Sequence, residues 1–381
     1  MYMNKKLFLF LGLFCFTNHI LSQAIQPGFD AREYRELMLL NVLTGSDSDT
    51  SAYAKKFEKP KLFKMIYRSP VMGLDNLWDH WERDGKVDAI SIRGTTRNAV
   101  SWLANFYAAM IPGKGSITLN DSSNFTYKFA EHPRAAVHVG WTIATGYLYQ
   151  DILPRIRERY RQGIHDFLII GHSQGGAISY LLTAQLRYAQ QQGDIPADIR
   201  FKTYCSAAPK PGNLFFAYDY EANIPEGWAY NVVNAADWVP ETPFSVQTVS
   251  DFNQPNPFAG MDTALKKQKL ITRLVVKYVY DRLNNPTIRS KRRFKKYLGK
   301  KAAGFVKKNL KGFKEPEYVH STNYVRAGAT IVLMPDEPYN AKYPSDNNNA
   351  FIHHLHDPYL LLLEKLEKPI MRAKLGQNST P

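Results

Sequence analysis

The sequence predicts an α/β fold, in which a mostly parallel sheet is covered by helices on both faces. Short apolar runs at 87–92, 167–170, 201–206 and 230–233 alternate with helically periodic segments such as 174–190. Continuous apolar runs are typical of strands buried on both faces, and alternation with helices favours a parallel sheet. The chain has 381 residues, 44 % of them hydrophobic, which supports a large core and excludes a disordered protein.

The remaining elements follow from periodicity and from turn residues. A helix is predicted at 30–43, where Tyr34, Leu37 and Leu40 are roughly helically spaced, and a strand is predicted within 61–68. Further predictions are a short helix at 74–81, a helix at 140–153 that stops near Pro154, a strand at 325–334 and a helix at 358–366.

The N-terminus has the pattern of a secretory signal peptide. Lys5 and Lys6 precede an apolar run at 7–16, and the small residues Ser22 and Ala24 follow where a signal peptidase reads. The alternative is a membrane anchor, for which the run is short, because a span needs about 20 residues. We therefore expect residues 1–24 to direct export to the periplasm or the extracellular space, and residues 25–381 to form a single domain.

The segment Gly171-His172-Ser173-Gln174-Gly175 follows an apolar strand and opens a helix. G-x-S-x-G in that context predicts a nucleophile elbow, a tight turn that presents Ser173 above the sheet. Gly171 and Gly175 leave room for close backbone approach. His172 points away from Ser173 on an extended strand, so it is interpreted as a packing residue under the elbow.

Four further motifs accompany the elbow in order along the chain, at 90–95, 137–141, 208–213 and 234–240. Their sequences are Ile-Ser-Ile-Arg-Gly-Thr, Val-His-Val-Gly-Trp, Ala-Pro-Lys-Pro-Gly-Asn and Asn-Ala-Ala-Asp-Trp-Val-Pro. Together with the elbow they resemble the class 3 (fungal-type) lipase family of the α/β-hydrolases. The resemblance implies an α/β-hydrolase fold, ester hydrolysis without a cofactor, and a lipid or ester substrate.

The sequence departs from the family pattern in three places. Gln174 stands where Leu is commonest, but it would contribute its backbone amide. Lys210 and Pro211 replace the usual Arg-Val. A basic insertion separates the expected acid from the expected histidine.

A serine nucleophile needs a histidine base and a carboxylate that orients it, in the chain order Ser, Asp, His. Asp237 follows the strand at 230–233 and lies in the family's Asn-x-x-Asp motif. The resemblance places the histidine in the cluster His353, His354 and His356. A tyrosine five residues later, Tyr359, favours His354, whereas a shorter spacing favours His356. No metal site is expected, because no spaced carboxylate or cysteine accompanies these histidines.

Two backbone amides should form the oxyanion hole. One is the amide of Gln174, which follows the nucleophile. The resemblance puts the other at Thr95, whose amide and hydroxyl could both donate; the alternative for this segment is a simple turn. The family also has a lid between the positions that correspond to Thr96 and the elbow helix, for which Trp102, Phe106 and Met110 are candidates; an ordinary loop is the alternative.

The net charge of +15 is concentrated in one segment. Residues 266–314 contain 18 Lys and Arg and a single acid, Asp281. Apolar residues recur at helical spacing, so 264–314 is predicted to be an insertion of two basic amphipathic helices joined by a turn at 284–286. Either its apolar stripes pack on the enzyme body, or it rests on an anionic membrane or lipid surface. Nucleic-acid binding is not expected of an exported enzyme.

The expected function is therefore that of a secreted serine lipase or esterase. Within enzymes, the alternative is a phospholipase A1 or another carboxylesterase. Outside enzymes, it is a non-catalytic protein that binds lipid surfaces on the same scaffold.

Overall fold

The computed structural model describes residues 24–46, 51–258, 261–266, 268–345 and 348–377. The predicted signal peptide lies outside these residues, apart from Ala24. A seven-stranded sheet organises the chain, in the order β1-β2-β3-β8-β9-β11-β13. β1 and β2 pair antiparallel, and the five strands from β3 to β13 run parallel. The predicted α/β architecture is confirmed.

The strands of this sheet are β1 (Lys64–Arg68), β2 (Trp78–Arg83), β3 (Val87–Ile92), β8 (Asp166–His172), β9 (Arg200–Ser206), β11 (Ala229–Asn234) and β13 (Ala329–Leu333). A smaller sheet contains β12 (Tyr324–Val325), β10 (Gly212–Asn213), β7 (Ala136–His138) and β4 (Met110–Pro112), and a hairpin contains β5 (Lys114–Asn120) and β6 (Ser123–Lys128).

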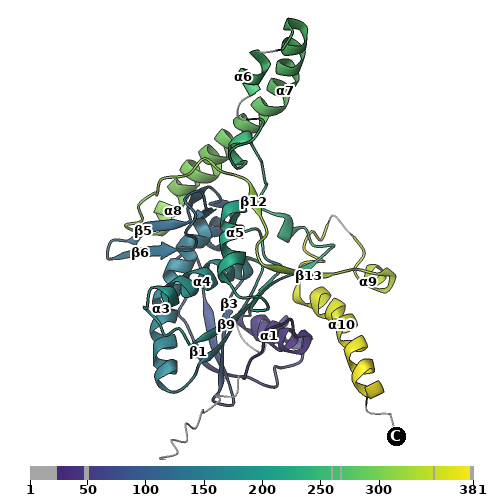
Figure 1. The fold of residues 1–381 in the computed structure, drawn as a ribbon. Helices are drawn as coiled ribbons and strands as arrows, with labels where there is room; N and C mark the ends of the chain where they lie inside the picture. The colour runs from purple at the N-terminus through teal and green to yellow at the C-terminus, as the bar shows by residue number, and fades with distance from the viewer. Residues whose placement is uncertain (1–23, 47–50, 259–260, 267, 346–347, 378–381) are drawn as a thin grey trace, which may run out of the picture.

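Helices cover both faces of the main sheet (Figure 1). On one face, α1 (Ala31–Thr44) and α10 (His356–Gln377) share a hydrophobic core with Leu168 and Ile170 of β8. On the other face, α3 (Val139–Arg161) and α4 (Gln174–Gln191) share a core with Phe167 and Ile169. Alternate residues of the apolar run in β8 therefore enter opposite cores, because successive side chains of a strand point to opposite faces. A short α5 (Leu214–Asn223) follows β10.

The helix predicted at 74–81 is wrong. Residues 73–75 form a turn closed by a bridge between Met72 and Asn76, and β2 begins at Trp78. β2 pairs with β3 along its whole length, with Trp78 opposite Ile92. The apolar spacing of this short segment also fits a helix, but pairing with β3 determines its conformation.

Two other boundaries also differ from the prediction. α3 continues through Pro154 to Arg161, since Ile152 and Ile156 are buried on either side of the proline and hold the helix against the core. The strand predicted at 325–334 is divided into β12 and β13, which belong to different sheets. Between them Gly328 has a φ of 77°, a turn conformation that glycine adopts without strain.

The basic insertion is helical, as predicted, but its predicted break is wrong. α6 (Met261–Lys266) is followed by α7 (Leu270–Lys295), which runs without interruption through Pro286. A π-helical turn, η4 (Lys296–Lys301), then leads into α8 (Ala302–Asn309). The Thr287 hydroxyl donates to the carbonyl of Asn284 within the proline-containing turn. α6 and the first half of α7 project from the body as an arm (Figure 1).

Among the described residues, no helix has the length and hydrophobicity needed to cross a membrane. Cys205, which lies among the described residues, is a free thiol buried in the core.

A buried charge cluster fixes the end of α3 against the sheet. The Asp88 carboxylate of β3 is fully buried and accepts hydrogen bonds from Arg159 Nε at 2.7 Å and Nη2 at 2.8 Å. His80 Nε2 lies 2.7 Å from the same carboxylate. Burial raises the pKa of Asp88, but the hydrogen bonds from Arg159 and His80 outweigh it and hold the pKa below its usual value.

We predict that Arg159→Ala destabilises the fold by about 3 kcal/mol, because it leaves a buried carboxylate without its main partner. Urea unfolding at neutral pH would measure the change. Arg157→Ala is the matched control, since Arg157 is exposed and donates to the Asp194 carbonyl. Equal stability of the two variants would contradict a structural role for the cluster.

Candidate active site

Ser173 lies at the sharp turn between β8 and α4. Its φ is 61° and its ψ −128°, a strained backbone conformation for a residue with a side chain. Its amide donates to the Ser206 carbonyl at 2.9 Å. The predicted elbow is therefore present, and α4 begins directly after the serine with its N-terminal amides beside it.

Glycine is required at both ends of the elbow. A Cβ added to Gly171 would lie 2.1 Å from the carbonyl oxygen of Gly175. A Cβ added to Gly175 would lie 2.3 Å from the carbonyl oxygen of Ile92 at the end of β3. Both distances are far below a van der Waals contact, so β3, β8 and α4 can only approach one another this closely with glycine at these positions.

Asp237 and His354 are joined by a short hydrogen bond. His354 Nδ1 lies 2.7 Å from Asp237 Oδ2, and both side chains are buried. Asp237 follows β11, and its Oδ1 accepts from the Val239 amide at 3.0 Å. The Tyr359 hydroxyl donates to Oδ2 at 2.7 Å. These bonds fix the carboxylate and leave Nε2 of His354 as the nitrogen that could accept a proton from serine.

The two rival histidines face other partners. His353 Nδ1 lies 2.9 Å from the Tyr339 hydroxyl. His356 is buried in the core, with Nε2 3.2 Å from Asn41 Oδ1 and Nδ1 2.9 Å from the Tyr53 hydroxyl. Burial, followed by the neighbouring His354, lowers the pKa of His356 to about 3. The geometry thus brings only His354 of the three to Asp237.

His172 does more than pack beneath the elbow. Its Nε2 donates to the carbonyl oxygen of His354 at 2.6 Å. Its Nδ1 must then accept, and the Ser206 hydroxyl lies 3.0 Å away as the donor. Burial lowers the pKa of His172 well below its usual value, which keeps the ring neutral for this pattern. Sequence reasoning missed this role, because nothing in the motif indicates that a residue 182 positions later lies against it.

His172 therefore places the backbone of His354 directly beside the elbow. Among the described residues, however, Ser173 Oγ makes no hydrogen bond to His354. A loose serine–histidine contact is common in the absence of substrate.

The loop after β3 lies next to the nucleophile. A Cβ added to Gly94 would be 3.6 Å from Ser173 Cβ. Within the described part of the chain, the amides of Thr95 and Gln174 have no acceptor, as expected of oxyanion-hole donors. The Thr95 hydroxyl, in contrast, already donates to Gln174 Oε1 at 2.8 Å and accepts from Asn105. Of the two donors predicted at Thr95, only the amide is free.

Asp75 holds this loop in place and was not found from the sequence. Arg93 Nη2 donates to the Asp75 carbonyl at 2.8 Å and to its carboxylate at 3.1 Å. The Thr96 hydroxyl donates to the same carboxylate. Asp75 belongs to the turn that was predicted as a helix, so its contact with the loop became visible only in the tertiary structure.

An aromatic row extends from α2 (Ala99–Phe106) to His354. Trp102 stacks on Phe106, with ring centroids 6.0 Å apart, and contacts Phe351 at 6.2 Å. Phe351 in turn lies 5.9 Å from the His354 ring. Two of the three lid candidates, Trp102 and Phe106, therefore border the site.

Met110, the third lid candidate, was predicted wrongly. It belongs to β4 and is buried against Phe294 and Tyr324, because it pairs with β7 in the smaller sheet. A residue fixed in a buried ladder cannot move as part of a lid.

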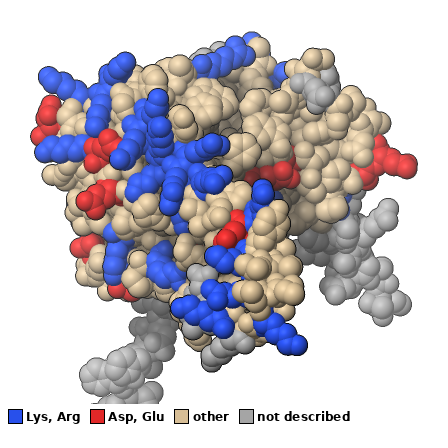
Figure 2. Space-filling view, turned by 90° about the horizontal axis from the view of Figure 1, so that it is seen from above, with Lys and Arg blue, Asp and Glu red and all other residues tan. Residues whose placement is uncertain are grey.

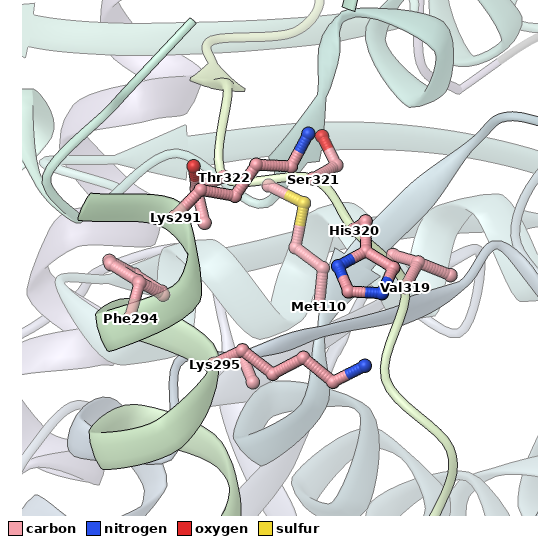
Figure 3. A pocket seen from close by; sticks show the side chains of 9 residues that line it. Met110, Lys291, Phe294, Lys295, Val319, His320, Ser321 and Thr322 are labelled. Atoms are coloured by element: carbon pink, nitrogen blue, oxygen red, sulfur yellow. The ribbon is translucent and has the colours of Figure 1, made fainter. Parts of the chain in front are cut away.

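Two pockets of the described chain lie at the base of α7, away from Ser173. One is lined by the last turns of α7 and the segment 319–322, with Lys295 extending toward the side of His320 and Lys291 toward Ser321 and Thr322 (Figure 3). The neighbouring one has a volume of about 310 Å³ and also contains Lys291 and His320 in its lining. Neither includes the nucleophile, Asp237 or His354. Within the described ranges, no group of three His, Cys, Asp or Glu side chains is arranged to hold a metal ion.

The chain was compared with known proteins. The family model of class 3 lipases matches residues 89–247. Similar solved structures include a fungal lipase in complex with an inhibitor, at 18 % identity and a TM-score of 0.42 over 56 % of this chain and 74 % of that one. A triacylglycerol lipase from Penicillium expansum is 16 % identical, with a TM-score of 0.40, and lipase II from Rhizopus niveus is 22 % identical, with a TM-score of 0.39. Each of these matches also covers 56 % of this chain and 74 % of the other. No curated protein sequence matches significantly.

The parallel sheet, with its elbow between β8 and α4, is that of an α/β-hydrolase. Residues 89–247, which match the class 3 lipase family model, contain the elbow and Asp237.

The neutral histidines make the fold sensitive to acid. Burial holds the pKa of His356 at about 3 and that of His172 well below its usual value, whereas in the unfolded chain both take up a proton near pH 6.5. Between these values the unfolded state binds more protons, so stability falls as the pH is lowered. We predict a loss of up to about 1.4 kcal/mol per pH unit for each histidine, measured by urea unfolding between about pH 7 and pH 4.

His356→Gln should flatten this pH dependence, since glutamine does not titrate. Tyr53→Phe is the matched control: it removes the hydrogen bond to His356 Nδ1 but leaves the titrating ring in place. An unchanged pH slope in His356→Gln would show that its burial does not control acid unfolding.

Proposed function

We propose that this protein is a serine hydrolase that cleaves carboxylic esters of lipids, with Ser173, Asp237 and His354 as its catalytic triad. The observation that carries the proposal is the 2.7 Å hydrogen bond from His354 Nδ1 to Asp237, beside a serine with the backbone strain of a nucleophile elbow. The class 3 lipase match at 89–247 supports the same activity.

The chain's own groups account for each step of acyl transfer. His354 Nε2 takes the proton of Ser173 Oγ as the oxygen attacks the ester carbonyl carbon. The amides of Thr95 and Gln174 donate to the oxyanion, and Asp237 stabilises the imidazolium. The carbon–oxygen bond to the alcohol then breaks, and His354 gives the alcohol its proton. Water, activated by the same histidine, hydrolyses the acyl-enzyme and releases the acid. No step requires a metal or a cofactor.

A lipid substrate fits the rim of the site. Phe106, Trp238 and Leu355 are exposed and apolar, and Trp238 contacts Phe351 of the aromatic row. Exposed apolar side chains gathered near a catalytic serine are suited to acyl chains. Phospholipase A1 activity or another carboxylesterase activity uses the same chemistry, and hydrolysis of an ester panel would distinguish them.

We further propose export and an anionic lipid surface as partner. Residues 1–24 would be removed as a signal peptide, so that 25–381 form one exported domain. The 18 cations of 266–314, opposed by Asp281 alone, would attract the domain to an anionic membrane or lipid surface.

Ser173→Ala is expected to fold normally and to lose esterase activity by about 10⁴-fold or more, because the acyl-enzyme cannot form. Hydrolysis of a soluble short-chain ester and labelling by a fluorophosphonate probe would measure this. An active Ser173→Ala enzyme would refute the mechanism. A wild-type protein that neither hydrolyses esters nor reacts with the probe would instead be a non-catalytic lipid-binding scaffold.

His354→Ala should be about as damaging as Ser173→Ala, since serine without its base is a weak nucleophile. His353→Ala and His356→Ala should retain measurable activity, because their rings bond to Tyr339 and to Asn41 with Tyr53. The test is the turnover rate of each variant at neutral pH, after circular dichroism has established folding. Loss of activity in His356→Ala alone would transfer the role of base to His356.

A further inference from the structure

The first half of α7 exposes a large apolar surface. Eight side chains between 270 and 283 are apolar and exposed, with Ile271 at 77 % and Leu283 at 70 % of full exposure. The set is Leu270, Ile271, Leu274, Val275, Val276, Tyr278, Val279 and Leu283. α6 contacts this half but leaves these side chains uncovered. A contiguous apolar surface of this kind on a protein marks an interaction site.

Five of the eight apolar side chains share one side of the helix. At 100° per residue, Leu274, Tyr278, Ile271, Val275 and Val279 fall within an arc of about 140°. Arg273 and Lys277 lie on the opposite side. The distal half of α7 is therefore an amphipathic helix with a cationic back, the pattern of helices that lie in a membrane interface.

The second half of the insertion differs, because the body covers its apolar stripe. Phe294 packs with Met110 and Tyr324, and Ala303 and Val306 are buried in the main core. The packing account is therefore confirmed for the proximal half only, because the apolar side chains of the distal half stay exposed among the described residues.

The root of the arm is held firmly. Lys291 Nζ donates to Thr248 Oγ1 at 3.1 Å and to Ser250 Oγ at 2.9 Å, and Lys295 Nζ donates to the Tyr318 carbonyl at 2.9 Å. Figure 3 shows both lysines on the turns of α7 that face 319–322. The Ala109 amide donates to the Leu298 carbonyl, and α8 contacts α2 beside the site. A surface that bound the arm would thereby be linked to the helix that borders His354.

Charge determines which partner fits. Lys and Arg side chains crowd the face from which the arm projects, and acidic side chains are sparse there (Figure 2). Asp281, the acid of α7, is paired with Lys277 at 3.3 Å. A second copy would bring an equally cationic helix against the first and be repelled, whereas anionic headgroups would be attracted.

We propose that the arm formed by α6 and α7 is a membrane anchor, whose apolar side chains at 270–283 insert among the acyl chains of an anionic bilayer while its cations contact the headgroups. The proposal deepens the proposed function, on which it rests for the lipid nature of the substrate surface. Insertion and electrostatic attraction alone predict different results in high salt. Salt screens the charges, so only inserted apolar side chains would keep the protein bound to the vesicles.

Vesicle binding tests this insertion, in a Ser173→Ala background so that hydrolysis does not alter the lipid. The vesicles are phosphatidylcholine mixed with phosphatidylglycerol. Ile271→Ser/Val275→Ser/Val279→Ser should bind at least about tenfold more weakly and lose binding in high salt, whereas the parent should retain part of it. The control, Met65→Ser/Ile66→Ser/Val71→Ser, changes three exposed apolar residues outside the arm and should bind like the parent.

A fluorescent label measures insertion directly. In the protein without residues 1–24, which contain Cys15, the native cysteine is the buried Cys205, so a cysteine introduced at 275 or 277 can be labelled selectively. The emission of an environment-sensitive dye at Val275→Cys should shift to the blue when vesicles are added, and lipids that have a quencher on the acyl chain should reduce it. The same dye at Lys277→Cys, on the cationic side, should show neither effect.

Parental affinity in the triple arm variant, or equal spectra at the two labelled positions, would overturn the anchor. So would a lipid-free dimer that the triple variant abolishes, since the occupant would then be a second copy. The proposed activity is tested separately, by measuring hydrolysis of a soluble ester with the enzyme that retains Ser173. Its absence refutes the proposed activity, while vesicle insertion alone decides the anchor.

Discussion

The site depends on the close backbone approach of β3, β8 and α4. Gly171 and Gly175 allow carbonyl groups to lie where any Cβ would clash, which places the strained Ser173 above the carboxyl end of the sheet. The same approach brings the amides of Thr95 and Gln174 to one side of the serine. The serine and the amides proposed as oxyanion donors are thus held by backbone packing rather than by flexible side chains.

Around that turn, a hydrogen-bonded core joins parts of the chain that are far apart in sequence. Tyr34 from α1 and His172 from β8 meet at the Ser206 hydroxyl, and His172 also reaches the backbone of His354. His356 stacks on His172, with ring centroids 4.3 Å apart. The rings must stay neutral to keep these bonds, so the same burial that orders the base makes the structure vulnerable to acid.

The basic insertion shows that a similar sequence pattern can have two structural outcomes. Both halves are amphipathic and cationic, but only the proximal half meets an apolar surface of the body, through Phe294 and Val306. The distal half extends beyond that surface (Figure 1). The root of the arm is bonded to the body through Lys291 and Lys295, and α8, which follows it, contacts α2.

The sequence by itself determined the alternating fold, the elbow and the positions of Asp237 and Thr95, because these are local patterns: apolar runs, glycine spacing and short motifs. It left three histidines as the base, since His353, His354 and His356 differ only in which partner the fold brings to them. The tertiary structure brings only His354 of the three to Asp237, places Asp75 against the loop after β3 and His172 against the His354 backbone, and buries Met110 in the core. It also overrode local signals at 74–81, Pro154 and Pro286. Contacts between residues distant in sequence leave no local pattern, so only the folded chain reveals them.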